Sequence, residues 1–366
     1  MPVMRAHRDG AMVRGHRVPA DRLRVLRPLE SDLRALMAML RVPVRQVQAT
    51  LLALTLLIAA GVRADDAPVA FITNQGSHDV SVVDLRSGVE RQRITVAAGP
   101  AGVAVDGVHG RAYVTSPDGR ALTEIPVRQP GRQRVLALEG GPVGIALDAL
   151  RERIYVADWF GNQLLVVDVQ AWQIVQRIAL GHVPAGVAVS PDGGRVYVAE
   201  RDDDTVAVIG VPENRVLTRI AVGHHPFGLA LDRTGRQLFA VNVLSNDVSV
   251  IDLQAAVPQT VATVPVGQTP YCAVWTDDQR LWVTNQHGDS VSVIDLASRR
   301  VIATIATGAF PEGIDVDGGR VLVVSWMDEE LDVIDRVTLQ VTRRIGLGHN
   351  SRGFGQFVWH PSTAGS

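Results

Sequence analysis

Hydrophobic and polar positions over residues 68–360 follow a repeat of about 42 residues. Each repeat contains a short run of β-branched or aromatic residues that ends in a polar residue. After a short polar loop comes a second apolar run, such as residues 248–252. Runs of this composition, bounded by Gly, Asn and Asp, predict β-strands. The first run occurs seven times, at residues 71–74, 113–116, 155–158, 197–200, 239–242, 282–285 and 322–325.

Two further runs complete each repeat. One of them, for example residues 176–180, alternates polar and apolar positions, which predicts an exposed outer strand. The other begins at a Pro-x-Gly element such as Pro184-Ala185-Gly186 and continues with small apolar residues, which suit a crowded innermost strand. Four strands in about 40–45 residues are typical of a propeller blade. The sequence therefore predicts an all-β fold, a seven-bladed β-propeller with four-stranded antiparallel blades.

The order of the runs also predicts how the ring closes. The repeat region opens on the second strand of a blade at Ala70, and it ends on a segment of the innermost type, residues 353–359. We expect this C-terminal strand to pair into the first blade, which removes both free edges of the sheet.

The N-terminal region has a different pattern. Residues 39–64 have a basic start, an apolar stretch at 49–62 and a small residue, Ala64, at a suitable cleavage position, as in a secretory signal peptide. The apolar stretch is shorter than the roughly 20 residues of a membrane span. We therefore assign residues 39–64 to a signal peptide and 65–366 to the propeller, with a periplasmic or secreted location. An uncleaved anchor is the alternative, and residues 1–38 are interpreted as a mis-assigned upstream extension or a disordered Arg-rich tail.

Charge and cysteine content narrow the function classes. The formal net charge is −2, but residues 1–64 hold eleven arginines and four acids, so residues 65–366 hold 25 basic and 34 acidic groups, a net of −9. That balance disfavours nucleic-acid binding. The single cysteine excludes an internal disulfide and a Cys-x-x-Cys-His haem attachment.

Three motifs together resemble a known family. The Tyr-Val-Thr-Asn type of run, the Val-Ser-Val-Ile-Asp run at 291–295 and the Gly-x-x-Pro-x-Gly element are similar to those of the YVTN-repeat, YncE-like seven-bladed β-propellers of bacterial envelopes. The resemblance implies the propeller fold and export. It implies several roles, because relatives include a nucleic-acid-binding example, propeller subunits of quinone-dependent amine dehydrogenases and, more distantly, propeller lactonases.

Histidines mark one candidate binding surface. His182, His224 and His349 each follow the glycine of an outer-to-inner loop, and His225 follows His224. Equivalent positions in different blades point toward a common axis, where a metal or an anionic ligand could be held. In the alternative interpretation, each histidine hydrogen-bonds its own loop and recurs only because the unit was duplicated.

Broken repeats mark a second set of candidates. The middle residue of Pro-x-Gly is small in several blades but is Phe227, Tyr271, Glu312 and Arg352 in the others, and Cys272 replaces a glycine. This asymmetry predicts a ligand-binding site at the channel mouth near these residues. Two alternatives stay open: Glu312 and Arg352 pair with each other across adjacent blades, and Cys272 packs as a small hydrophobic residue rather than acting as a ligand or reactive thiol.

These observations lead to a functional hypothesis. We expect a monomeric periplasmic scaffold that binds another envelope protein or a small ligand through the loops at one mouth of its channel, with no catalysis of its own and no cofactor. A lactonase-like hydrolase with a divalent metal in the channel, or a propeller subunit associated with a quinone-dependent dehydrogenase, is the alternative. Nucleic-acid binding is a third and disfavoured hypothesis.

Overall fold

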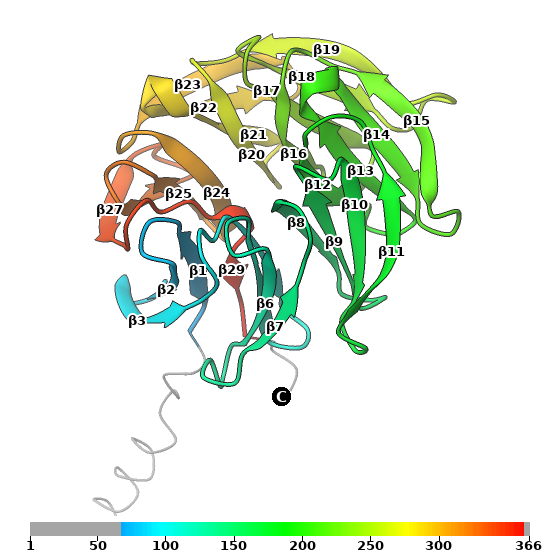
Figure 1. The fold of residues 1–366 in the computed structure, drawn as a ribbon. Coiled ribbons are helices and arrows are strands. Elements are labelled where there is room, and N and C mark those ends of the chain that lie inside the picture. Colours follow the sequence, from blue (N-terminus) through cyan, green and yellow to red (C-terminus); the bar gives the residue numbers. More distant parts are fainter. Residues whose placement is uncertain (1–66, 362–366) are drawn as a thin grey trace, which may run out of the picture. The chain divides into compact units, whose positions relative to one another are not determined.

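The computed structural model describes residues 67–361. The predictions for residues 1–38 and 39–64 concern parts of the chain outside this range. The described residues belong to one compact unit, a ring of seven antiparallel blades, as the repeats predict (Figure 1). Two single-turn 3₁₀ helices, η3 (Arg201–Asp203) and η4 (Gln286–Gly288), interrupt the loops. No helix within residues 67–361 has the length and apolar character needed to cross a membrane.

Each blade has strands A to D, counted from the axis outward. The A strands are β29 (Val358–Trp359), β4 (Gly102–Asp106), β8 (Pro142–Asp148), β12 (Pro184–Val189), β16 (Pro226–Leu231), β20 (Pro270–Thr276) and β24 (Pro311–Asp317). The B strands are β1 (Val69–Asn74), β5 (Arg111–Ser116), β9 (Arg153–Asp158), β13 (Arg195–Glu200), β17 (Gln237–Asn242), β21 (Arg280–Asn285) and β25 (Arg320–Ser325). The C strands are β2 (Asp79–Asp84), β6 (Ala121–Pro126), β10 (Gln163–Asp168), β14 (Thr205–Gly210), β18 (Asp247–Asp252), β22 (Ser290–Asp295) and β26 (Glu330–Asp335). The D strands are β3 (Val89–Thr95), β7 (Arg134–Ala137), β11 (Gln173–Ala179), β15 (Arg215–Ala221), β19 (Gln259–Pro265), β23 (Arg300–Ala306) and β27 (Val341–Gly346).

The burial of the strands explains their composition. Every residue of β1 is buried, and the four central residues of β2 are buried, because both faces of a middle strand pack against neighbouring blades. In the outer strand β3 only Ile94 is buried. The alternating outer run and the apolar middle runs therefore have the positions that the sequence predicts for them. The hydrophobic core lies between the blades rather than within any one of them.

The threonine of the Tyr-Val-Thr-Asn run joins neighbouring blades. The Thr115 hydroxyl donates to the Val143 carbonyl of the next blade at 2.7 Å and accepts from the Gly102 amide of its own blade at 2.9 Å. Thr73 likewise donates to the Ala101 carbonyl at 2.8 Å. Each buried hydroxyl of this kind satisfies one backbone donor and one backbone acceptor. The inner strands of two neighbouring blades are therefore linked by hydrogen bonds through one threonine side chain.

A close backbone contact explains why the third residue of Pro-x-Gly is glycine. A Cβ atom at Gly144 would lie 1.8 Å from the Ala185 carbonyl oxygen of the next A strand. Only glycine allows the two backbones to approach this closely. The close approach of neighbouring A strands therefore requires glycine at this position.

We predict that Gly144→Ala lowers the free energy of unfolding by about 3 kcal/mol, because the new methyl group must push two inner strands apart. The matched control is Gly319→Ala, at a glycine where an added Cβ meets nothing within 4 Å. That variant should change stability by no more than about 0.5 kcal/mol. Urea titrations followed by tryptophan fluorescence measure both, and equal losses would refute the steric explanation.

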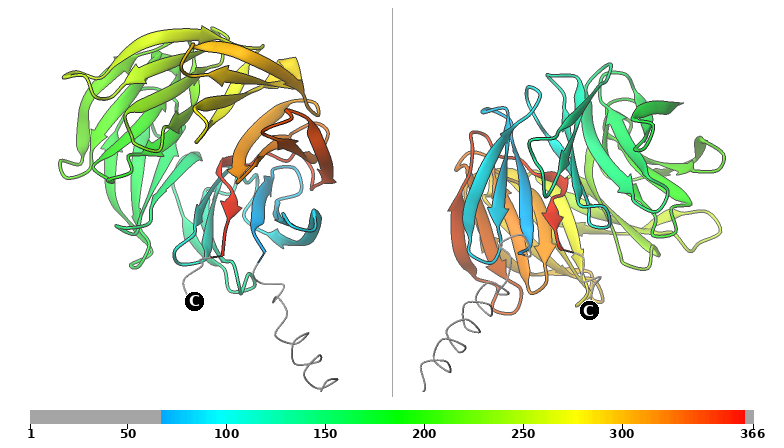
Figure 2. Two further views of the ribbon diagram at one scale, coloured as in Figure 1. Left: turned by 180° about the vertical axis from the view of Figure 1, so that it is seen from behind. Right: turned by 90° about the horizontal axis from the view of Figure 1, so that it is seen from below.

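The C-terminal segment closes the ring, as expected, with one difference in detail. Strand β29 pairs antiparallel with β1 and completes the first blade. Residues 354–356, expected to be part of the same strand, instead form β28 (Phe354–Gln356), which pairs parallel with β4 of the second blade. The red C-terminal strand beside the blue first blade is visible in Figure 2.

Gly355 and Asp315 position the C-terminal segment. Gly355 has a φ of +119°, and a Cβ there would lie 2.3 Å from the Val103 carbonyl oxygen of β4. Asp315 on β24 then fixes the position of the chain directly after β28. Its Oδ2 atom accepts from the Phe357 amide at 2.7 Å and from the Val358 amide at 2.9 Å. The side chain is buried, and burial raises the pKa of Asp315 to about 6.

We predict that Asp315→Ala destabilises the protein by about 2–4 kcal/mol, because the Val316, Phe357 and Val358 amides lose their acceptor. Asp252→Ala, which removes an acceptor from one exposed turn amide, is the control and should cost less than about 1 kcal/mol. Asp315→Asn keeps a carbonyl oxygen for the Phe357 and Val358 amides and should lie between wild type and Asp315→Ala.

The pH dependence of stability gives a second readout of the same carboxyl. Because its pKa is higher in the folded than in the unfolded chain, its contribution is full below about pH 4 and is lost as the pH rises through about 6. Between pH 4 and pH 7.5, wild type should therefore lose about 2–3 kcal/mol relative to Asp315→Asn. Parallel pH curves for the two proteins would contradict this assignment.

Candidate functional site

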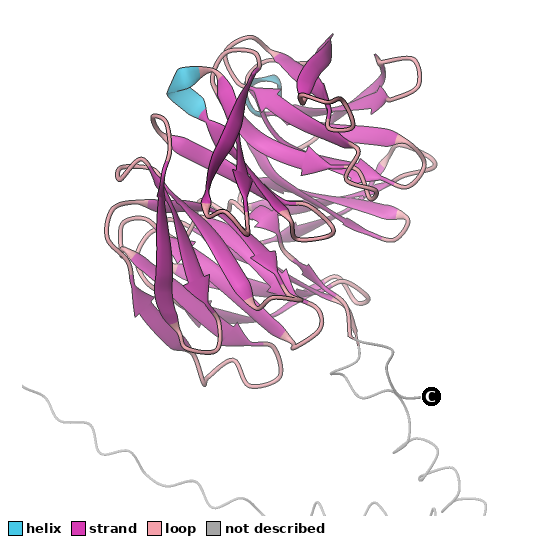
Figure 3. Ribbon diagram, turned by 90° about the vertical axis from the view of Figure 1, so that its right-hand side faces the viewer, coloured by secondary structure: helices cyan, strands magenta, loops and turns pink. Residues whose placement is uncertain are grey.

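Two sets of connections lie at opposite ends of the strands (Figure 3). The segments that join B to C and D to the next A form one face of the ring, which we call the loop face. The segments that join A to B and C to D form the other, which we call the turn face. All nine sequence-predicted site residues belong to loop-face segments or to the start of an A strand next to them.

Phe227 and Tyr271 come together at the loop-face end of the channel. Their ring centroids are 4.1 Å apart and the rings are stacked. Phe354 of β28 lies 4.8 Å from Phe227, and Trp159 from the blade-three loop lies 6.0 Å from it. Phe227, Tyr271 and Phe354 are here called the aromatic plug, because their rings pack together in one apolar cluster with Ala185.

Glu312 and Arg352 form an ion pair beside the plug. Arg352 Nε lies 3.1 Å from Glu312 Oε2, and the two residues come from adjacent blades. Glu312 is 3% exposed, and its Oε1 atom accepts from the Gln286 amide at 2.7 Å. Burial raises the pKa of Glu312, an effect opposed by the Arg352 guanidinium and the Gln286 amide. The pair therefore neutralises a carboxylate that the fold has buried.

Cys272 lies next to this pair and is also buried. Its backbone amide donates to the Thr284 hydroxyl at 3.0 Å, and its side chain belongs to an apolar cluster with Phe227 and Phe354. Burial raises the pKa of the Cys272 thiol well above its usual range, so the thiol is neutral at physiological pH.

The histidines do not converge on one point. His182 Nδ1 lies 2.8 Å from Asp203, His224 Nδ1 lies 2.7 Å from Asp204, and His349 Nδ1 lies 2.9 Å from Glu329. All three side chains are at least 70% exposed. The hydrogen bond that the imidazole makes to the Asp203 carboxylate raises the pKa of His182. Each imidazole therefore caps a neighbouring loop.

His225 has a backbone role. It has a φ of +54°, its amide donates to Asp204 Oδ1 at 2.8 Å, and its carbonyl accepts from the Val243 amide at 3.0 Å. Within residues 67–361, no three His, Cys, Asp or Glu side chains are grouped so that they could hold a metal ion.

The loop face carries exposed apolar side chains that the sequence reasoning did not single out as site residues. Phe160 is 74% exposed, Leu244 59% and Met327 55%. Half-buried Phe310 and Trp326 lie side by side, with ring centroids 6.0 Å apart. All five stand in B–C or D–A segments, where their exposure could be anticipated from loop position.

Charge is distributed unevenly between the faces. Counting each connecting segment with its two flanking strand residues, the described loop face has three arginines, Arg120, Arg201 and Arg352, and thirteen carboxylates. The turn-face segments hold sixteen arginines and fourteen carboxylates. The loop-face carboxylates are Asp79, Asp118, Glu139, Asp158, Glu200, Asp202, Asp203, Asp204, Asp247, Asp289, Asp328, Glu329 and Glu330. The acidic excess of the described chain is therefore on the loop face.

The fold defines the class of this protein, which is a seven-bladed β-propeller built from the four-strand repeat described above. The family model described as YNCE-like beta-propeller matches residues 63–236, which confirms the resemblance that the repeats indicate. No protein of curated function has a significant sequence match to the chain.

Solved structures share the fold at low sequence identity. A functionally unknown protein from Desulfotomaculum acetoxidans DSM 771 is 14% identical, with a TM-score of 0.70 over 80% of this chain and 99% of that chain. Kuenenia stuttgartiensis hydrazine synthase is 18% identical, with a TM-score of 0.63 over 70% of this chain and 89% of that chain. A candidate 6-phosphogluconolactonase from Bacteroides fragilis NCTC 9343 is 13% identical, with a TM-score of 0.65 over 79% and 98%. At these identities the similarity extends to the fold alone.

We predict that Arg352→Met lowers the free energy of unfolding at pH 7 by about 3–5 kcal/mol, because it leaves the Glu312 carboxylate buried without its cation. The double variant Glu312→Gln with Arg352→Met should recover most of this loss. The single variant should also regain stability as the pH falls, since protonation removes the buried charge. A double variant as unstable as the single one would show that packing, not charge, is the cause.

Proposed function

We propose that this propeller is an exported binding scaffold whose loop face docks a basic segment of another envelope protein, and that it performs no chemistry of its own. The observation that carries the proposal is the kind of exposed apolar residue on the acidic loop face, where Phe160 and Met327 are exposed, whereas the exposed large hydrophobic residues of the turn-face segments are aliphatic. The resemblance to a fold of many functions does not carry it, since fold alone leaves function open.

The kind of apolar residue differs between the faces. Exposed large hydrophobic residues on the turn face are aliphatic, as at Leu150 and Val337. The loop face instead presents Phe160 and Met327, beside Trp159 and Trp326. Aromatic residues and Met are enriched in protein interfaces, where a few of them supply most of the binding energy.

The loops that carry these residues are already ordered by hydrogen bonds. Asp158 Oδ1 accepts from the Gly141 amide at 2.8 Å and from the Gly161 amide at 3.0 Å, so it joins the segments on both sides of Phe160. Asn242 donates to Asp247 at 2.6 Å and to Ser249 at 3.0 Å in the blade that carries Leu244. A preorganised surface loses little conformational entropy when it binds.

Charge defines the chemistry of the partner. Of the thirteen carboxylates, Asp158 and Glu200 are buried, and Glu200 and Glu330 pair with Arg219 and Arg344 on the outer strands. The exposed remainder, at Asp118, Glu139, Asp202, Asp203, Asp289 and Asp328, repels phosphate groups and attracts Lys-rich or Arg-rich segments. The Arg201 guanidinium, 5.4 Å from the Trp159 ring, already forms on this face the cation–π contact that a partner's arginine could make. We therefore favour a basic protein segment over a nucleic acid.

Location completes the proposal. The signal-peptide pattern at residues 39–64 supports export to the periplasm or beyond. The partner would then be an envelope protein, bound by a propeller that acts as a monomer.

Site-specific photocrosslinking in living cells tests the docking face. A benzoylphenylalanine residue at Phe160 or Met327 should yield a crosslinked envelope protein. Matched positions on the turn face, Leu150 and Val337, are at least as exposed and should not. Crosslinks of equal yield from both faces, or from the turn face alone, would overturn the proposal.

Binding of the identified partner provides the quantitative test. Phe160→Ser with Met327→Ser should weaken binding by at least about tenfold, whereas Leu150→Ser with Val337→Ser should leave it unchanged. Raising the salt concentration should slow association, as expected for an acidic surface that meets a basic one.

A further inference from the structure

The centre of the ring contains a cavity of about 530 Å³ that has no part in the docking face. Its walls are the A strands of six blades and strand β28. Its remaining lining residues, among them Arg233, Asp277 and His360, belong to the turn-face end. No residue of a B–C or D–A loop lines it. The aromatic plug lies between it and the loop face, so the cavity is blind at that end and is approached from the turn face.

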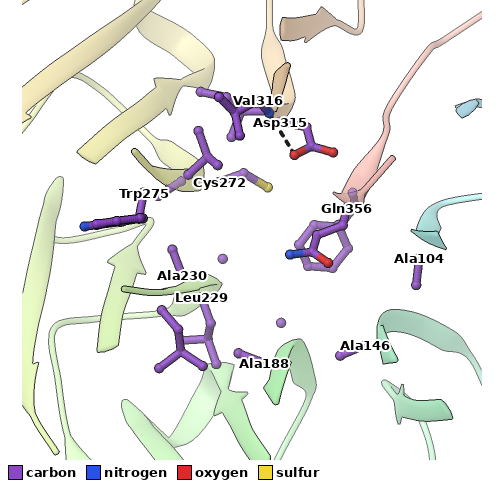
Figure 4. A pocket seen from close by; sticks show the side chains of 18 of the residues that line it. Ala104, Ala146, Ala188, Leu229, Ala230, Cys272, Trp275, Asp315, Val316 and Gln356 are labelled. Carbon is purple, nitrogen blue, oxygen red and sulfur yellow. Dashed lines mark hydrogen bonds between the residues drawn. The ribbon is translucent and has the colours of Figure 1, made fainter. Parts of the chain in front are cut away.

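The side chains that the inner strands present to the cavity are mainly apolar, and several of them are incompletely buried. Val187, Leu229, Val274 and Val316 each line the cavity and are only half-buried, although they belong to the innermost strands. Ala146 and Ala188 keep the wall open, because a larger side chain at these positions would project into the same space (Figure 4). A molecule that covered these side chains would gain the free energy of burying apolar surface.

The charged lining residues Arg233, Asp277 and Arg336 lie at the turn-face mouth, where Arg336 pairs with Asp277. The ionisable groups on the inner strands are not available to bind a charge. Both oxygens of Asp315 are occupied by backbone amides. The Cys272 thiol is neutral because burial raises its pKa. A charged ligand would lose its hydration here without gaining a partner. The interior of the cavity therefore favours an uncharged molecule.

Among the inner-strand residues that line the cavity, one uncharged polar side chain is free to bind. The Gln356 amide projects into the cavity from β28, and within residues 67–361 it has no hydrogen-bond partner (Figure 4). It can donate to a carbonyl or ether oxygen and accept from a hydroxyl or amide. Gly355, the neighbouring residue, allows β28 to approach β4 and so places Gln356 at this point.

We infer that the central cavity is a binding site for an uncharged, mainly apolar small molecule with one hydrogen-bonding group directed at Gln356. The ligand enters from the turn face and packs against the inner strands. This site is separate from the loop-face docking surface, and neither inference depends on the other.

The single thiol provides a reporter of occupancy. Cys272 is the chain's only cysteine, and it lines the cavity. The probe is 6-propionyl-2-dimethylaminonaphthalene, which is uncharged, carries one carbonyl group and shifts its emission to the blue in apolar surroundings. Saturating probe should show the blue shift and slow the alkylation of Cys272 by iodoacetamide at least about tenfold. Anilinonaphthalene sulfonate, a naphthalene of similar size with a negative charge, should bind at least about tenfold more weakly.

Variants separate the cavity from the protein surface. Gln356→Trp fills the cavity from an exposed side chain that makes no hydrogen bond within the described residues, and it should abolish both the blue shift and the protection of Cys272. Ala188→Phe fills it from the opposite wall and should do the same. Gln356→Leu should weaken probe binding about five- to tenfold through loss of one hydrogen bond. Val337→Trp, on the turn-face surface, is the control and should change nothing.

The inference is overturned if the probe binds without protecting Cys272, or if Gln356→Trp, with an unchanged thermal unfolding curve, still binds it. It is also overturned if the anionic probe binds as tightly as the uncharged one. Photocrosslinking at Phe160 would be unaffected by each of these results, so a failure of this site is distinguishable from a failure of the docking face.

Discussion

The contact between neighbouring innermost strands is the constraint on which the rest of this propeller depends. The A strands converge on one axis, and their backbones come so close that a Cβ at Gly144 would lie 1.8 Å from a carbonyl oxygen. The threonine of the B strand satisfies the polar groups at this junction, as Thr115 does for Val143 and Gly102. Because the glycine is required by the close backbone contact and the threonine by its hydrogen bonds to backbone groups, the middle residue of Pro-x-Gly is free to vary. The chemistry at the loop-face end of the channel is therefore determined by that residue.

Closure of the ring introduces the one large departure from sevenfold repetition. A propeller of seven equal blades would have seven similar A strands, but the first blade receives only the two-residue strand β29. The preceding residues cross to the second blade as β28, and Asp315 holds the chain where it returns. The departure adds Phe354 to the aromatic plug and Gln356 to the cavity wall. The pairing of residues 354–356 with the second blade thus helps to close the loop-face end of the channel with the Phe354 ring. It also gives the cavity the uncharged polar side chain of Gln356.

The sequence predicts the fold far better than the site, for physical reasons that particular residues illustrate. Strand order and blade number follow from a repeat seen seven times. One poorly matching copy, such as Leu122-Thr123-Glu124-Ile125-Pro126 at the position of Val248-Ser249-Val250-Ile251-Asp252, therefore does not change the result. The site has no such redundancy. The grouping of Phe227, Tyr271, Glu312 and Arg352 could be predicted from the sequence, because each of them departs from the repeat at the same position of its blade. Asp315 breaks the repeat in the same way at the position of Ala188, and this signal could have identified it. By contrast, β28 depends on a parallel pairing between residues about 250 positions apart, which no local pattern encodes.

The aromatic plug separates two surfaces that a simple open channel would have connected. Phe227 and Phe354 are buried, and Phe227 stacks on Tyr271, so an open path through the ring would require several packed rings to move together. Packed interiors resist such motion, because a small displacement of one side chain loses contacts with all of its neighbours. A molecule in the cavity therefore has no direct contact with a partner on the loop face. Two residues belong to both regions: Phe354 of β28 is part of the plug and lines the cavity, and Cys272 lines the cavity directly after Tyr271 of the plug. The same few residues that break the repeat are thus the ones through which the two ends of the ring are physically connected.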